Sequence, residues 1–209
     1  MENPSTRLLL GGMQLIAAYE FIVSGMDKIV SGRFPSGLGA TLMDGASDNP
    51  NHWYMSFIQS AIVPHAAAWG TLIEWGELAI GVCLLLGAAR WLFWPLIAPG
   101  GRRNPAFSLK LLTVIAALVG AFMTFNFHLW MGKAPIAVIN PNNPFDEGVD
   151  LDLTLTLALL MIAAVNALTF GAVQRVCSAQ AARIRRLVSA ARHSEPSRAA
   201  LVEVSAGRP

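Results

Sequence analysis

The chain has 209 residues, of which 54% are hydrophobic and 13% charged, whereas about 25% of the residues in an ordinary soluble domain are charged. This composition excludes a typical water-soluble fold. With 15 Lys and Arg against 13 Asp and Glu, the chain also lacks the broad basic field of a nucleic-acid-binding protein, so we expect no nucleic-acid partner. Cys83 and Cys177 form no CxxC motif, which excludes a disulfide framework and a thiolate zinc site.

Four apolar segments are long enough to cross a membrane. Crossing a hydrocarbon core of about 30 Å takes roughly 20 apolar helical residues, because every backbone N–H and C=O must be bonded inside the helix. The predicted spans cover residues 8–30, 66–86, 106–130 and 149–170. We therefore expect an all-α integral membrane protein, a bundle of four transmembrane helices. Residues 1–193 are predicted to form a single membrane-embedded domain and residues 194–209 a disordered tail.

The loops on the two sides of the predicted bundle differ in composition. The first outer loop, residues 31–64, is punctuated by Gly and Pro and ends in HWYMSFIQSAIV, whose aromatic residues suit a short interfacial helix. The second, residues 131–148, is rich in Asn and Pro, and we expect both loops to cap the outer mouth. Within residues 183–192, apolar residues recur at helical spacing with arginines around them, which predicts an amphipathic basic helix for anionic lipid headgroups. A simple extension of the fourth span accounts for this pattern equally well.

Lys and Arg are distributed asymmetrically between the two sides. With four spans, the N-terminus, the middle loop and the C-terminal segment share one side, and they hold one, four and seven basic residues, 12 of the 15 in the chain. Cytoplasmic segments carry an excess of Lys and Arg. We therefore predict a multi-pass protein of the inner (cytoplasmic) membrane with both termini in the cytoplasm.

The ionisable residues within the spans concentrate in the outer half of the bundle. Each costs about 2.5 to 3.5 kcal/mol at membrane depth, so such side chains usually face the bundle interior. Glu20 and Lys28 lie toward the outer end of the first span, and Glu74 and Glu77 are one helical turn apart in the second. We expect Lys28 to pair with one or more of these carboxylates. Glu20, Lys28, Glu74 and Glu77 are our candidate catalytic residues, although buried Glu–Lys pairs can also simply hold helices in register.

The polar residues at the outer ends of the third and fourth spans are weaker indicators of a functional site. Asp150 and Asp152 lie at a predicted helix N-terminus, where acidic residues stabilise the helix dipole, and we favour that role for them. His128 lies among aromatic residues and has no second His three or four positions away, so we predict no metal or haem site there. Asn126 and His128 are candidates for binding a cofactor, for which a quinone is considered.

Three segments resemble the DoxX family of membrane proteins. LLLGGMQLIAAYEFIVSGMDKIVSGRF and WGTLIEWGELAIGVCLLLGAARW look like the first two helices of that family, and FNFHLWMG is similar to a segment of DoxD, the membrane subunit of thiosulfate:quinone oxidoreductases. The resemblance covers about residues 8–170. It implies a four-helix membrane protein associated with redox partners and, in the DoxD branch, electron transfer from thiosulfate to a membrane quinone. By position it carries over the residues Gly25, Lys28, Glu74, Glu77, Gly81, Arg90, Asn126 and His128.

Two hypotheses from different classes follow. In the first, a quinone headgroup enters from the outer leaflet and meets Lys28, Glu74, Glu77 and His128, with electrons supplied through a partner subunit. The acidic insert at 133–152 argues against thiosulfate itself, because its carboxylates would repel a dianion. In the second, the chain is a non-catalytic accessory subunit of a larger redox or energy-converting membrane complex. Both hypotheses imply contacts with membrane lipids and with other membrane protein subunits.

Overall fold

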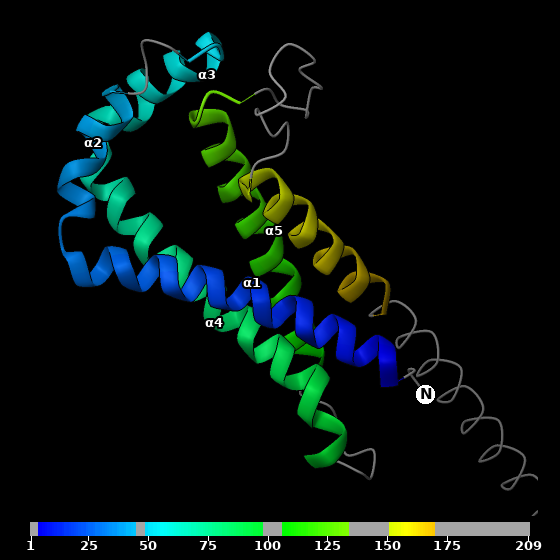
Figure 1. Cartoon of the computed structure of the whole chain (residues 1–209). Coiled ribbons are helices and arrows are strands. Elements are labelled where there is room, and N and C mark those ends of the chain that lie inside the picture. Colours follow the sequence, from blue (N-terminus) through cyan, green and yellow to red (C-terminus); the bar gives the residue numbers. More distant parts are fainter. Residues whose placement is uncertain (1–3, 45–48, 98–105, 134–150, 170–209) are drawn as a thin grey trace, which may run out of the picture. The chain divides into compact units, whose positions relative to one another are not determined.

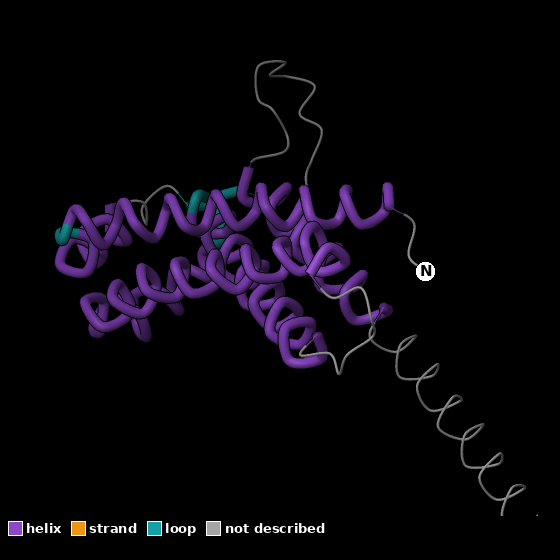
Figure 2. The backbone as a smooth tube through the Cα atoms, turned by 90° about the horizontal axis from the view of Figure 1, so that it is seen from below, coloured by secondary structure: helices purple, strands orange, loops and turns teal. Residues whose placement is uncertain are grey.

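The structure is helical throughout the residues that it describes. It is a computed structural model, and it describes residues 4–44, 49–97, 106–133 and 151–169. Figure 1 traces the helices in chain order, and Figure 2 shows no strand in these parts of the chain. The elements are α1 (Pro4–Ser31), α2 (Phe34–Asp44), α3 (His52–Phe57), the π-helical η1 (Ile58–Ile62), the 3₁₀-helical η2 (Val63–His65), α4 (Ala66–Ile97) and α5 (Ala106–Trp130), then the helix Leu151–Thr169.

Four helices are long and apolar enough to cross a membrane. They are Pro4–Ser31, His52–Phe93, Leu109–Trp130 and Leu151–Thr169. This confirms the predicted all-α architecture with four spans. Large apolar side chains such as Ile16 and Phe122 are exposed, at 73% and 69%, as expected where helices face lipid. The chain is therefore a multi-pass membrane protein whose helices contact lipid.

The second long helix is longer than the sequence predicts. The expected span was residues 66–86, whereas α4 ends at Ile97 and is preceded without a break by helical residues from His52 onward. The predicted interfacial segment is thus helical, but it continues directly into α4. Pro64 is tolerated because it lies in the short 3₁₀ turn η2, at the start of a helical segment where its missing N–H costs little.

Helix α2 occupies part of a segment that the sequence predicts as an irregular loop. Leu38 and Leu42 are four residues apart on this helix and both are buried. They pack in one apolar cluster with Tyr54 of α3 and Leu129 of α5. The first outer loop is therefore a helical cap on one end of α5. The rest of the expected cap, the predicted helix at 183–192, the domain limit at 193 and the predicted tail lie outside the described residues.

The middle of the bundle is a core to which four helices contribute. Phe21 of α1, Leu84 of α4 and Leu159 of the fourth span are buried together with alanines of α5. The hydroxyl groups of Thr124 and Thr156 lie 2.7 Å apart and link α5 to the fourth span. These contacts belong to a compact unit of residues 1–167, and a second unit begins at residue 168.

Helices α1 and α4 run antiparallel and approach each other closely (Figure 1). A Cβ atom at Gly25 would lie 2.8 Å from the Leu78 backbone nitrogen, and one at Gly81 would lie 2.8 Å from that of Ile22. Small residues allow backbones to come this close between membrane helices. Small residues that recur every seven positions stay on one face of α1 over several turns. The small residues that recur at this interval and are buried on α1 are Gly11, Ala18 and Gly25.

Two asparagine side chains close the end of α5. The Asn49 amide nitrogen donates to the carbonyl oxygens of Leu129 at 3.1 Å and Trp130 at 2.8 Å, and that of Asn51 donates to Leu129 at 3.1 Å and Lys133 at 3.0 Å. Both side chains are buried. The last carbonyls of a helix have no partner inside the helix, and these amides supply one. The segment before α3 is thereby fixed to α5.

Replacing Gly25 by Ala is expected to destabilise the bundle. The added methyl group would meet the backbone nitrogen of Leu78 at 2.8 Å, and backbone cannot move aside without displacing α4, so we expect a loss of about 1–3 kcal/mol. Gly12 is the matched control, because nothing lies within 4 Å of its Cβ position. Gly12→Ala should keep or slightly raise the thermal unfolding midpoint in detergent. Equal midpoints for the two variants would contradict the close packing.

Replacing Asn51 by Ala is expected to loosen the cap. The substitution removes the hydrogen bonds from Asn51 to the Leu129 and Lys133 carbonyl oxygens, while Asn49 still donates to Leu129, so we expect a loss of about 0.5–1.5 kcal/mol for each bond removed. The neighbouring His52 is exposed, so His52→Ala serves as the control and should be close to neutral. Hydrogen exchange of the α3 and α5 amides measures the effect. Unchanged protection in Asn51→Ala would show that these hydrogen bonds do not hold the cap.

Candidate functional site

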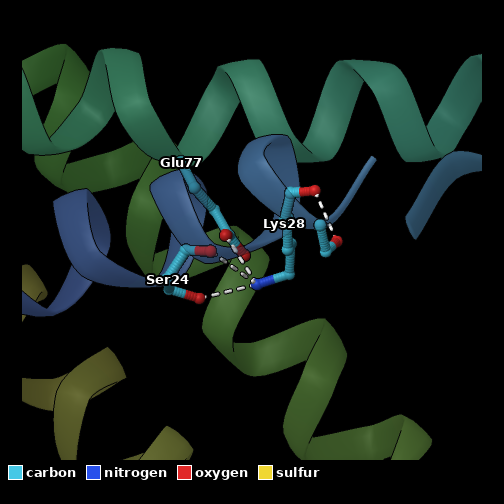
Figure 3. A network of polar contacts seen from close by, with 4 residues as sticks. Ser24, Lys28 and Glu77 are labelled. Atoms are coloured by element: carbon cyan, nitrogen blue, oxygen red, sulfur yellow. Dashed lines mark hydrogen bonds and ion pairs between the residues drawn. The ribbon is translucent and has the colours of Figure 1, made fainter. Parts of the chain in front are cut away.

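An ion pair with a buried carboxylate joins α1 to α4. Lys28 Nζ lies 2.7 Å from Glu77 Oε2 and donates to the Ser24 hydroxyl oxygen at 2.6 Å (Figure 3). The Glu77 side chain is 2% exposed and that of Lys28 is 20% exposed. The prediction that Lys28 pairs with a carboxylate is confirmed, and Glu77 is the partner. Removing either residue alone would leave the other charge without compensation in a low dielectric.

The close approach of α1 and α4 at Gly25 positions this pair. A Cβ atom at Gly25 would lie 3.1 Å from the Glu74 carbonyl oxygen and 3.2 Å from the Glu77 Cβ. Ser24 and Lys28 are four residues apart on α1 and share a face beside this contact. A larger residue at position 25 would therefore move Glu77 away from Lys28.

Glu74 adds a second buried carboxylate one helical turn before Glu77. Glu74 is 7% exposed. Within the described part of the chain, Glu74 Oε2 is buried and has no hydrogen-bond partner. A buried polar atom left without a partner costs about 1–3 kcal/mol. This oxygen can therefore accept a hydrogen bond from a ligand or a water molecule at a net gain in free energy.

Lys28 also lines a cleft at the junction of α1 and α2. The cleft has a volume of about 380 Å³, and its lining includes Asp27, Arg33, Phe34 and Leu38. The Lys28 ammonium lies 5.3 Å from the centroid of the Phe34 ring, which is within the range of a cation–π contact. The cleft thus combines two cationic groups and one carboxyl group with an aromatic ring and an aliphatic side chain. Lys28 connects it to the buried carboxylate of Glu77.

The other predicted site residues have different surroundings. Glu20 lies on an exposed part of α1, and no described hydrogen bond joins it to Lys28. Asn126 holds the cap, because its side-chain and backbone oxygens each accept from the Tyr54 hydroxyl at 3.1 Å. His128 is buried and stacks on the Phe125 ring. Of the predicted catalytic set, the structure joins Lys28 to Glu77, and Glu74 is buried one helical turn earlier on α4.

Sequence reasoning missed a second polar region, built around Trp91. The Trp91 indole nitrogen donates to Asn166 Oδ1 at 3.4 Å, and its backbone carbonyl accepts from Arg7 Nη2 at 3.1 Å. Lys110, which the charge count assigned to the loop side, is 5% exposed. Arg90 and Trp91 lie inside α4, beyond the predicted end of the second span. The apolar residues that follow Arg90 were the signal that this helix continues.

Comparisons with known proteins identify no relative: no family model, curated protein or solved structure matches the chain. The chemistry of the site therefore follows from its own side chains. Among the described residues, no group of three or more His, Cys, Asp or Glu could hold a metal ion. Lys28 offers hydrogen-bond donors at the wall of a cleft, Glu77 offers a buried carboxyl group bonded to it, and Glu74 offers a second buried carboxyl group one turn away on α4.

Proposed function

We propose that this protein is a DoxX-like membrane subunit linked to quinone redox chemistry, in which the cleft lined by Lys28 receives the quinone headgroup. One observation carries the proposal: the same ammonium group lines a cleft of about 380 Å³ and bonds a carboxylate that is 2% exposed. An ionic group at membrane depth is costly and usually functional. The resemblance of the sequence to the DoxX family supports the same assignment.

The groups around the cleft suit a flat ring with carbonyl acceptors. The Lys28 ammonium has three hydrogens, and two of them form short hydrogen bonds to Ser24 Oγ and Glu77 Oε2. The third has only a long contact, with 3.5 Å between Lys28 Nζ and the Ser24 carbonyl oxygen. This third hydrogen can turn to a carbonyl oxygen of a ligand. Phe34 offers an aromatic face beside it, and ring faces stack favourably on one another. The pocket volume falls within the range of about 300–1,000 Å³ for small-molecule sites.

The buried carboxyl groups suit the proton side of the reaction. Reduction of a quinone to a quinol consumes two electrons and two protons. Carboxyl groups at membrane depth form proton relays in pumps and transporters, and we propose that Glu74 and Glu77 deliver protons to the headgroup. The electrons come from a partner subunit that oxidises the donor. The resemblance implies thiosulfate or a related donor, and the acidic insert at 133–152 favours a related donor over thiosulfate itself.

We propose that the protein lies in the inner (cytoplasmic) membrane with both termini in the cytoplasm. The basic residues of the termini and middle loop support this orientation. In this orientation Lys28 lies in the outer half of the bundle, so the headgroup enters from the outer leaflet.

Removing Lys28 is expected to abolish tight quinone binding. Lys28→Met should weaken the binding of a short-chain ubiquinone analogue to the protein in nanodiscs by tenfold or more, equivalent to about 1.4 kcal/mol, as for a hydrogen bond to a charged group. The single variant leaves Glu77 buried and unpaired, so Lys28→Met/Glu77→Met is measured with it. The double variant removes both charges and can retain the fold.

Asp44→Asn provides the matched control for these binding measurements, because Asp44 is an exposed carboxylate at the end of α2. It should bind the analogue as the unchanged protein does. Failure of the unchanged protein to bind, or full binding by the double variant, would overturn the quinone site.

Glu74→Gln is expected to separate binding from proton delivery. The amide keeps the shape of the side chain but cannot exchange a proton, so quinone affinity should stay within about threefold while quinone reduction slows by tenfold or more. A positioned proton donor contributes about 10²–10⁴-fold to rate. The measurement is quinone reduction by the complex purified from native membranes in mild detergent, with Asp44→Asn as control.

The accessory-subunit hypothesis predicts a different result in the same preparation. The chain would co-purify in stoichiometric amount with a larger complex, and the quinone reduction rate of that complex would be unchanged by Glu74→Gln and by Lys28→Met/Glu77→Met. This outcome would contradict a role for the site in the reaction.

A further inference from the structure

Helix α1 carries a carboxyl group on a face away from its contact with α4. The packed face includes the buried residues Phe21 and Gly25, whereas Glu20 is exposed. Ile16 and Val23 lie one helical turn before and after Glu20 and are 73% and 48% exposed. Among the described residues, no hydrogen bond or ion pair involves the Glu20 side chain. The carboxyl group therefore lies within an apolar helix face that no described helix covers.

Glu20 is far from both ends of α1. The helix has 28 residues and is about 42 Å long, whereas the hydrocarbon core is about 30 Å thick. Glu20 lies 11 positions before the last residue, Ser31, which is about 16 Å along the helix axis. Lys and Arg near helix ends extend their long side chains to the membrane surface. The shorter side chain of Glu20, more than two turns from an end, stays at membrane depth.

Lipid does not compensate a carboxyl group at this depth. An unpaired carboxylate in a low dielectric is costly, and a neutral carboxyl group still finds no hydrogen-bond partner among hydrocarbon chains. Ionisable side chains in membrane helices therefore usually face a bundle interior or a water-filled cavity, or pair with one another. The cationic groups of lipids belong to headgroups at the membrane surface. A cation that meets Glu20 at membrane depth must therefore come from a protein side chain.

A second copy of this chain does not offer that cation on its described membrane spans. The Lys and Arg residues of these spans are Arg7, Lys28, Arg90 and Lys110. None of the four is exposed, and each already makes contacts within the chain. Two copies that met through this face of α1 would also bring two Glu20 carboxyl groups together, and like charges at one site oppose each other. The cation is therefore expected on a different protein.

We infer that this face of α1 is the docking surface for a transmembrane helix of a different protein, and that a Lys or Arg of that helix pairs with Glu20. Helices and closed barrels are the structures that span hydrocarbon, and a helix fits the exposed apolar row of Ile16, Val23 and Val30 beside Glu20. Polar contacts hold membrane helices together, and complementary charge selects the partner. The inference is independent of the quinone site, whose residues it does not use.

Photo-cross-linking of the full-length chain in native membranes tests the docking surface. The photoreactive residue p-benzoylphenylalanine replaces Val23, and the cross-linked segment is sequenced by mass spectrometry. The expected product is an apolar segment of another protein, about 20 residues long, that contains a Lys or Arg. The control carries the same photoreactive residue in place of Phe122, which is 69% exposed on α5. It should give no product with that segment.

Substitution of Glu20 tests whether its charge holds the partner. Glu20→Leu should lower the yield of the cross-linked product by about tenfold or more, as expected when a buried charge pair loses one member. Glu20→Lys should abolish the product, because it places two cations together. Glu20→Leu also removes a polar group from an apolar surface, so the purified chain should unfold in detergent at an unchanged or higher temperature. A lower unfolding temperature would indicate a role within the chain and would overturn the inference.

Asp44→Asn is the matched control for the substitutions, because Asp44 is an exposed carboxylate at the end of α2. It should leave the yield of the product unchanged. A product with a second copy of this chain, a product whose segment lacks Lys and Arg, or the absence of any protein product would overturn the inference. A yield that Glu20→Leu leaves unchanged would overturn it as well.

Discussion

The antiparallel contact between α1 and α4 is the constraint on which the rest of the structure depends. Lipid chains are as apolar as the helices, so backbone closeness and polar contacts, rather than burial of apolar surface, hold membrane helices together. Gly25 and Gly81 provide the closeness, since a Cβ at either position would meet backbone atoms at 2.8 Å. The same contact brings Lys28 to 2.7 Å from Glu77 at one end and Arg7 to 3.1 Å from the Trp91 carbonyl at the other.

The charges are sorted along this contact. The end near Lys28 holds the buried carboxylates Glu74 and Glu77, whereas the segments around Trp91 hold cations and no Asp or Glu. Opposite charge patterns recognise different chemistry. Our proposed function uses the first end, where a quinone headgroup and its protons would meet Lys28 and the carboxyl groups.

Sequence patterns predicted the spans well because apolar runs of about 20 residues have few alternatives to a membrane helix. They also predicted the pairing of Lys28. They placed Glu20 in the same site, but Glu20 is five residues before Gly25, about 140° around the helix from the packed face, and it is exposed. Helix α2 was missed because its Gly and Pro residues are typical of a loop, although Leu38 and Leu42 are spaced for one face of a helix. The Trp91 region was missed because tertiary contact, not local pattern, makes it buried.

The most direct test of the central claim measures the distance between Lys28 and Glu77 in a lipid bilayer. Solid-state nuclear magnetic resonance with ¹⁵N-labelled lysine and ¹³C-labelled glutamate reports the dipolar coupling of the ammonium nitrogen to the carboxylate carbon. A separation of 2.7 Å from Nζ to Oε2 predicts a measurable coupling that disappears in Glu77→Gln and remains in Glu74→Gln. Absence of this coupling in the unchanged protein, or its loss in Glu74→Gln alone, would contradict the account.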